Sequence, residues 1–582
     1  MSTLADFTTQ NLSNTLWACA KLEFHHEPGI QALAAGALAK LTELRAQDVC
    51  SIVWSCALLQ MKDWPLLTSL SSAALTMLPA CGAQGLANLA WSCATLQFVP
   101  APLLASISGE AISLLVRLEF KTQEQANLAW AFAKMQVGDL PLMESIAAAA
   151  IAKIHVAQPQ DISSTAWAFA KMSMQHMPLF DAISEEAIRR RSQFGAQELS
   201  NIVWSYAVLS LVHTPLLESI AESALSQCSD WRPQELANTS WSFAKLAVLD
   251  QPLLDAIARQ SITLMPQFTP QEIVNMAWAY AQLVICNAPL FDAMSAAALR
   301  MCVDWSPRDL ANTVWAWARL SRDDLPLFDV IAGAALARMP AMNQQDLSNT
   351  SWAYARCELQ NAPLLHAIAA QALRMRGAVD SRSISLIAWS LAKCIVGDEP
   401  LMTALACEAL ALISEASPQG LANTAWAFAT SAVPNAPLFE AIAAESLRLM
   451  TQFGQQELGN TAWAFAELRV YNVPLIDAIS AAALSSIGSA ELGSGPDDER
   501  DRGSYAIAWA QGRLACTDQV RELVVGHASA GHFHILSFGL LIVDEEWRRF
   551  STTGGALNTL ERFLGGPTTR RVAALPENVV AP

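Results

Sequence analysis

The sequence is poor in charged residues and has no long apolar run, and both absences narrow the class of protein. Only 15% of its 582 residues are charged, whereas 53% are hydrophobic, so the chain has ample material for a core. Asn, Gln, Pro or a charged residue interrupts every apolar stretch before it reaches the roughly 18 residues that a membrane-spanning helix needs. We therefore expect a soluble, folded protein without a membrane segment.

Closely spaced cysteine pairs are also missing. None of the twelve cysteines forms a C-x-x-C pair, the spacing typical of redox and zinc sites. Cys19, Cys56 and Cys93 stand at one place of a repeated motif where other copies carry Phe or Tyr. We expect them to be reduced core residues, neither disulfides nor metal ligands.

Motifs of catalysis and metal binding are absent as well. The sequence contains no phosphate-binding Gly loop, nucleophile elbow or H-E-x-x-H pair. Cys516, His527, His532 and His534 lie near one another in sequence, but the second thiolate of a C2H2 zinc site is missing. We expect no enzyme activity, no cofactor, no metal and no small-molecule substrate.

The opening stretch MSTLADFTTQ has no Arg or Lys, and Trp17 already belongs to the repeated motif. No cleavable signal or basic transit peptide precedes that motif. Either the chain stays where it is made or its N-terminus is incomplete.

The sequence does contain a repeat of 37 residues. Tryptophans recur at 17, 54, 91, 130, 167, 204, 241, 278, 315, 352, 389, 426 and 463, with one step of 39. With each of these Trp residues as position 0, alanine stands at +3 and proline at +11 in all thirteen copies. A proline is tolerated at the first position of a helix but not inside one, so +11 begins a second helix. Each copy is therefore a pair of helices, and such pairs stack.

We predict an all-α fold, a right-handed α-solenoid superhelix of two-helix repeats with an architecture like that of armadillo, HEAT and tetratricopeptide proteins. Thirteen repeats cover residues 1–487. A loop rich in acidic, Gly and Ser residues occupies 488–503, and a degenerate repeat with a helical cap occupies 504–552. The tail at 553–582 is predicted to be disordered.

The formal net charge of -17 argues against a nucleic-acid partner, because such partners favour basic surfaces. Much of this charge recurs at two positions, since −6 is acidic in nine copies and +14 in eight. We expect both positions to lie in first turns of helices, where carboxylates complement the helix dipole. Acids at helix starts would then account for the net negative charge, and another part of the surface could still be basic.

Positions −3, +1 and +4 are spaced to share one side of the first helix. Position −3 is Asn in ten copies: Asn14, Asn88, Asn127, Asn201, Asn238, Asn275, Asn312, Asn349, Asn423 and Asn460. Position +4 is basic in seven: Lys21, Lys134, Lys171, Lys245, Arg319, Arg356 and Lys393. Two structural explanations stay open, in which the cations complement the helix dipole and the asparagines form a buried ladder. For the Trp we expect packing between helices and not base stacking.

The stretches QELANTSWSFAKL, RDLANTVWAWARL and QGLANTAWAFAT resemble octotricopeptide repeats, and the period matches the heptatricopeptide variant better. The resemblance covers more than four-fifths of the chain. Helical-repeat subunits of RNA-editing substrate-binding complexes and FAST-kinase-like proteins are similar, although the RAP domain of many such proteins is not evident here. The resemblance implies binding of single-stranded organellar RNA in a mitochondrion or chloroplast, alongside other proteins of an RNA-processing complex.

The RNA-binding residues that we predict are the seven cations at +4 together with Asn127, Asn201, Asn238, Asn275, Asn312 and Asn349. The alternative is an armadillo-like scaffold that binds a peptide or protein, which the acidic balance favours. Armadillo-like repeats place Asn after the Trp and need about 40 or more residues, whereas here Asn precedes it.

Overall fold

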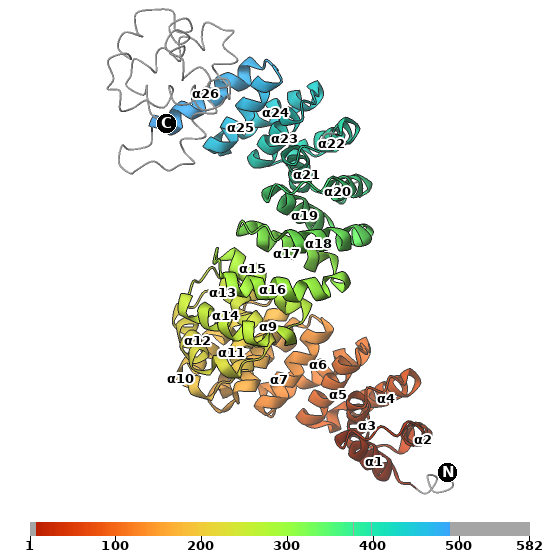
Figure 1. The fold of residues 1–582 in the computed structure, drawn as a ribbon. Coiled ribbons are helices and arrows are strands. Elements are labelled where there is room, and N and C mark those ends of the chain that lie inside the picture. The colour runs from red at the N-terminus through yellow and green to blue at the C-terminus, as the bar shows by residue number, and fades with distance from the viewer. Residues whose placement is uncertain (1–6, 376, 397, 489–582) are drawn as a thin grey trace, which may run out of the picture. The chain divides into compact units, whose positions relative to one another are not determined.

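Twenty-six α-helices and ten short 3-10 helices make up the part of the chain that the computed structural model describes, residues 7–375, 377–396 and 398–488, and those residues include no strand. The α-helices alternate between a first helix of each repeat, helix A, and a second, helix B (Figure 1). The all-α solenoid of two-helix repeats is thereby confirmed.

Helix A is the odd-numbered helix of each pair and carries the recurring Trp. The bounds are α1 (Thr9–Lys21), α3 (Ala46–Leu58), α5 (Gly82–Leu96), α7 (Thr122–Met135), α9 (Pro159–Lys171), α11 (Ala196–Val208), α13 (Pro233–Lys245), α15 (Pro270–Gln282), α17 (Pro307–Arg319), α19 (Gln344–Arg356), α21 (Ser381–Lys393), α23 (Pro418–Thr430) and α25 (Gln455–Glu467).

Helix B is the even-numbered helix, and in most repeats a single 3-10 turn follows it. The bounds are α2 (Glu27–Ala39), α4 (Trp64–Met77), α6 (Ala101–Val116), α8 (Leu140–Lys153), α10 (Met177–Arg189), α12 (Thr214–Gln227), α14 (Gln251–Leu264), α16 (Ala288–Met301), α18 (Leu325–Arg338), α20 (Ala362–Arg374), α22 (Glu399–Ala411), α24 (Ala436–Leu449) and α26 (Val473–Gly488). Throughout the described ranges, helices fall short of the length and apolarity that a membrane crossing requires.

The chain divides into two compact units, Met1–Ala297 and Ala298–Pro582. Within each unit, helix A packs closely on helix A of the next repeat, as α13 does on α15 and α17 on α19. Small residues at +1 and +3 permit this close approach, and in α13 the exposed fractions of Ser242 and Ala244 are only 0% and 2%. The aromatic residues at +2 are core residues as predicted, including Phe243 and Tyr280.

Helix A begins with the caps that the sequence predicts. In α15 the backbone N–H of Thr269 donates to Oε2 of Glu272 at 2.7 Å, and in α17 the hydroxyl oxygen of Ser306 accepts from the N–H of Asp309 at 3.3 Å. These bonds satisfy donors that have no partner within the helix.

Helix A ends at a residue with left-handed backbone at +6 in all thirteen copies, and none of these residues is glycine. In α13 that residue is Ala247, with φ 55°, and the N–H of Val248 donates back to the carbonyl of Phe243 at 2.9 Å. This closing pattern is the Schellman motif, and it ends helix A at the +4 residue or one residue later.

Helix B begins one residue earlier than predicted. The recurring proline is its second residue, because α14 starts at Gln251 and Pro252 follows. The side chain of Asp250 precedes the helix and accepts a hydrogen bond from the N–H of Leu253 at 3.0 Å. A proline at the second position costs no bond, since the first four N–H groups of a helix have no partner within it.

The change Asp250→Ala is expected to lower the free energy of unfolding by about 1 kcal/mol, because it removes this cap. Asp250→Asn is the matched control, since Asn287 caps the next helix B in the same way at 3.1 Å. Urea unfolding followed by circular dichroism measures both. An Asp250→Ala midpoint equal to that of the Asn variant would contradict the capping role.

The acidic residues at +14 do not lie in a first turn, so that part of the charge prediction is wrong. Asp255 is the fifth residue of α14, and no residue of that first turn is acidic. Glu144, Asp181 and Glu218 occupy the same place and are exposed. The +14 acids therefore form part of the solvent-facing side of helix B.

Glu186 is a buried carboxylate that lies among three basic side chains. Glu186 in α10 is 1% exposed, and it accepts from Arg190 at 3.1 Å, from Arg189 and from His155 at 2.8 Å. Burial alone would raise the pKa of Glu186, but the hydrogen bonds from Arg189, His155 and Arg190 outweigh it and hold the pKa below its ordinary value.

The change Glu186→Gln is expected to destabilise the chain at neutral pH by about 1–3 kcal/mol, because two arginines lose a buried partner. A depressed carboxyl pKa stabilises the fold above the ordinary pKa of about 4.3 and stops doing so as pH falls through the folded value. The difference between the parent and the variant should therefore shrink in acid. Urea midpoints at several pH values test this, with the exposed neighbour Glu185→Gln as control; a difference that grows in acid would contradict it.

Of the three cysteines predicted to lie in the core, Cys56 and Cys93 are buried and Cys19 is partly exposed. The predictions for residues beyond Gly488, including the loop, the degenerate repeat, the tail and the cluster of Cys516 with three histidines, fall outside the described residues.

Candidate nucleic-acid interface

One side of helix A stays at the surface when the repeats stack, and positions −7, −3, 0 and +4 form it. We call this set the A stripe. In α13 it consists of Gln234, Asn238, Trp241 and Lys245, of which Gln234 and Lys245 are exposed and the other two are partly exposed. The spacings of four, three and four residues place these side chains on one face of a helix. All thirteen copies are at least partly exposed at all four positions.

The predicted stripe was wrong at its middle position. Position +1 is buried in twelve copies, and in α13 the hydroxyl of Ser242 donates to the carbonyl of Asn238 at 2.6 Å. The reason is the close packing of neighbouring A helices, which covers the small +1 residue and leaves the larger residue at 0 at the surface.

The recurring Trp residues pack against one another between neighbouring A helices, but they are not fully buried there. Trp17 is 46% exposed, and the other twelve are partly exposed. Seven pairs of neighbouring Trp rings lie side by side, three of them stacked and four tilted by 33–38°. The ring centroids lie 6.4 Å apart for Trp17 and Trp54, 6.4 Å for Trp130 and Trp167, 6.3 Å for Trp167 and Trp204, 6.1 Å for Trp241 and Trp278, 6.5 Å for Trp315 and Trp352, and 6.3 Å for both Trp389 with Trp426 and Trp426 with Trp463. Each unit thus has a row of neighbouring Trp rings that are partly exposed to solvent, which we call the Trp ladder.

The asparagines at −3 do not form the buried ladder that was one explanation for them. Asn14 is exposed and the other nine are partly exposed. Across residues 7–375, 377–396 and 398–488, none of the ten side-chain amides hydrogen-bonds to the protein. Their donors and acceptors are therefore available to a ligand.

The seven predicted cations at +4 are all exposed and lie in the last turn of helix A. Lys393 pairs with Glu358 at 2.9 Å, and this hydrogen bond holds the pKa of Glu358 below its ordinary value. The other six have no ion pair within the described part of the chain. Their place in the last turn also complements the helix dipole, but that role leaves the charged groups free to meet an anion.

A fourth position of the A stripe escaped the sequence reasoning. Position −7 is Gln in eleven copies and Arg in two, Arg308 and Arg382, and all thirteen are exposed. In the described ranges no side-chain amide of these glutamines hydrogen-bonds to the protein. The available signal was the recurrence of Gln or Arg at −7 in every copy. It is easily assigned to the helix start instead, because −7 lies in the first turn beside the acid at −6.

The A stripe has the opposite charge to the chain. It carries nine cations, the seven at +4 and two at −7, and one acid, Glu467. Its formal charge is therefore +9 − 1 = +8, within a chain of -17. Eight copies of helix B carry an acid at +14, and most of these acids are exposed, so the positive charge of the A stripe is offset by acids elsewhere in the repeats.

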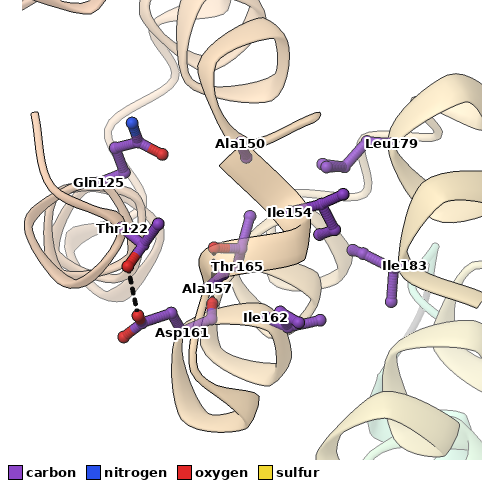
Figure 2. Close-up of a pocket in the computed structure, with 10 residues that line it drawn as sticks. All are labelled: Thr122, Gln125, Ala150, Ile154, Ala157, Asp161, Ile162, Thr165, Leu179 and Ile183. Carbon is purple, nitrogen blue, oxygen red and sulfur yellow. Dashed lines mark hydrogen bonds between the residues drawn. The ribbon is translucent and has the colours of Figure 1, made fainter. Parts of the chain in front are cut away.

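A small cavity lies among α7, α8, α9 and α10 (Figure 2). Mostly apolar side chains line it, and Thr122 donates to Asp161 across it at 2.7 Å. Its volume of ≈ 10 Å³ has room for about one water molecule, far less than the several hundred Å³ of a small-molecule site. Groups of three or more metal-ligating side chains are not found in the described ranges.

The chain matches the model of a protein family described as RNA-editing substrate-binding complex 6 protein, over residues 1–140, 141–287 and 250–474. The comparison with curated proteins found no match.

Among solved structures, the chain is similar to one in a homology model of the full-length AP-3 complex in an intermediate open conformation, with 10% identity over 88% of this chain and 92% of that one and a TM-score of 0.31. It is also similar to the karyopherin Kap121p, solved bound to the SUMO protease Ulp1p, with 13% identity over 99% and 71% and a TM-score of 0.31.

Proposed function

We propose that this chain, which belongs to the RNA-editing substrate-binding complex 6 protein family, binds single-stranded RNA along the A stripe and catalyses no reaction. The observation that carries the proposal is the row of unpaired amides at −7 and −3 on the positively charged side of helix A. Amide side chains offer a donor and an acceptor together, which matches the edges of bases.

The other two positions of the A stripe complete a site for a nucleic-acid strand. Exposed Lys and Arg at +4 neutralise phosphates, and the partly exposed Trp ladder offers an apolar edge to bases. Helical repeats read splayed bases of single strands, because a base in a duplex hides its pairing edge. The asparagine and glutamine amides are thus assigned to bases and the cations to the backbone.

The proposal includes an organellar setting. The family description supports a role in RNA editing, with other proteins of an RNA-processing complex as partners. The location we propose is the mitochondrion, and the chloroplast is the alternative that the repeat resemblance leaves. Fractionation of cells that express a tagged full chain tests the location.

A protein-binding scaffold of armadillo type is the second candidate, and one observation favours it. The exposed acids at +14, such as Glu144 and Asp181, suit a basic protein segment along helix B. Binding through helix B would not depend on the A stripe, and this difference separates the two candidates.

The direct experiment is to measure binding of the full chain to fluorescent single-stranded organellar RNA, to the same RNA as a duplex, and to a basic peptide. The proposal predicts binding of the single strand in preference to the duplex. Binding of the peptide but of no RNA would favour the scaffold.

A further inference from the structure

Two cysteine thiols meet within the unit Met1–Ala297. Cys50 belongs to α3, and Cys81 immediately precedes α5. Their sulfur atoms lie 3.7 Å apart. Cys50 is 6% exposed, whereas Cys81 is partly exposed. We propose that Cys50 and Cys81 are a modification site, at which a peroxide joins α3 reversibly to the start of α5 by a disulfide.

The start of α5 departs from the other copies in a way that makes room for both sulfurs. Gly85 stands at position −6, where nine copies carry an acid. A Cβ atom at Gly85 would lie 3.0 Å from Cβ of Cys81 and 3.2 Å from the sulfur of Cys50, closer than side chains normally pack. Elsewhere at −10, the position of Cys81, the chain carries mostly large apolar residues such as Phe194 and Trp231. A disulfide requires the sulfurs to approach to about 2.0 Å, which rotation of the two short side chains can supply.

The two thiols differ in the way that a peroxide-sensitive pair requires. The hydrogen bond from Cys50 lowers the pKa of Cys81 although burial opposes it, and the start of a helix favours a thiolate there as well. The same hydrogen bond is the largest cause of a raised pKa at Cys50, and burial is the next. Cys81 is thus the more accessible thiol and the one with the lowered pKa, whereas Cys50 is a buried thiol in contact with it.

The reaction balances with hydrogen peroxide as the oxidant. The Cys81 thiolate attacks one peroxide oxygen, so that an S–O bond forms, the O–O bond breaks and hydroxide leaves. The Cys50 sulfur then attacks the sulfur of Cys81, an S–S bond forms, the S–O bond breaks, and the Cys50 proton leaves with the hydroxyl as water. Two thiols are oxidised and one peroxide is reduced. A dithiol reductant reverses the bond by exchange.

Peptide mapping of the full chain after peroxide treatment tests the proposal. Trypsin places Cys50 in the peptide 46–62 with Cys56, and Cys81 in the peptide 63–117 with Cys93, so fragmentation spectra must identify the linked pair. We expect a Cys50–Cys81 link that dithiothreitol removes, and a loss of two hydrogens from the intact mass. A chain whose peroxide oxidation falls on other cysteines, with Cys50 and Cys81 still reduced, would overturn it.

Variants separate the two roles without relying on stability. Cys50→Ser should leave a sulfenic acid at Cys81 that dimedone traps, whereas Cys81→Ser should leave Cys50 unmodified at the same peroxide dose. Cys407→Ser, which removes an exposed thiol far along the chain, should form the link as the parent does. Equal dimedone labelling of Cys81 in the parent and in Cys50→Ser would show that Cys50 does not act on Cys81.

Discussion

Glutamine substitutions at five cations of the A stripe together are expected to weaken RNA binding by on the order of 10³-fold in about 0.1 M salt. The five changes are Lys134→Gln, Lys171→Gln, Lys245→Gln, Arg319→Gln and Arg356→Gln. Each residue is exposed, and none forms an ion pair within the described residues. The fold should therefore survive the loss of all five charges.

Counterion release sets the size of this effect. A phosphate contact with single-stranded nucleic acid contributes about −0.7 to the slope of log affinity against log salt, so seven contacts give about −5 and the two that remain give about −1.4. Binding titrations across a range of salt concentrations measure both slopes. Variants confined to Lys134, Lys171 and Lys245, or to Arg319 and Arg356, show what each of the two units contributes.

The matched control removes five arginines that lie off the A stripe, on helix B or just after it. These are Arg117→Gln, Arg191→Gln, Arg259→Gln, Arg300→Gln and Arg374→Gln, all exposed, and of these Arg117 and Arg191 pair with the exposed Glu119 and Glu222. The net charge changes by the same amount, but the slope should stay close to that of the parent. If the two five-residue variants lose affinity equally, the attraction comes from overall charge and not from the A stripe.

Alanine at three neighbouring asparagines is expected to lower RNA affinity by about 100-fold without destabilising the fold. The changes are Asn201→Ala, Asn238→Ala and Asn275→Ala, all in the unit Met1–Ala297. A hydrogen bond lost to a base costs about 1 kcal/mol, and three of them give this factor. Since these amides have no partner in the described protein and Ala is the better helix former, the free energy of unfolding should rise by a few tenths of a kcal/mol per site.

Loss of affinity together with a gain in stability distinguishes a binding role from a structural one. The salt slope should remain that of the parent, while the preference among bases should relax, because base contacts and not phosphate contacts have been removed. Gln197→Ala, Gln234→Ala and Gln271→Ala provide the equivalent test at −7. Exposed glutamines of the 3-10 turns, Gln267→Ala and Gln452→Ala, serve as the control. Destabilisation by the asparagine changes would instead support a structural ladder.

The fold could be predicted from the sequence because short-range chemistry determines it. The Trp period gives the repeat, the caps at −9 and −6 give the start of helix A, and the proline at +11 separates the two helices to within one residue. Each of these signals depends only on residues a few positions apart, so it can be recognised in a single sequence without knowledge of the packing.

The exposed face could be predicted only in part, because packing between repeats decides it. Asn238 and Lys245 were correctly placed on one side of helix A. Ser242 was predicted to share that exposed side and Trp241 to pack between helices, whereas in the structure Ser242 is buried and Trp241 is partly exposed. The small +1 residue is covered where two A helices meet, and the large Trp, which is usually a core residue, remains at the surface beside its counterpart in the next repeat. No rule for a single helix reveals which of two adjacent residues a neighbour will cover.

Ultraviolet cross-linking of the full chain to bound single-stranded RNA, followed by mapping of the modified peptides, tests the central claim most directly. The account predicts cross-links on helix A in both units, at the Trp ladder and at the amides and cations beside it, such as Trp204, Asn238 and Lys245. Cross-links concentrated on the exposed side of helix B, around Asp181 and Glu218, would contradict it.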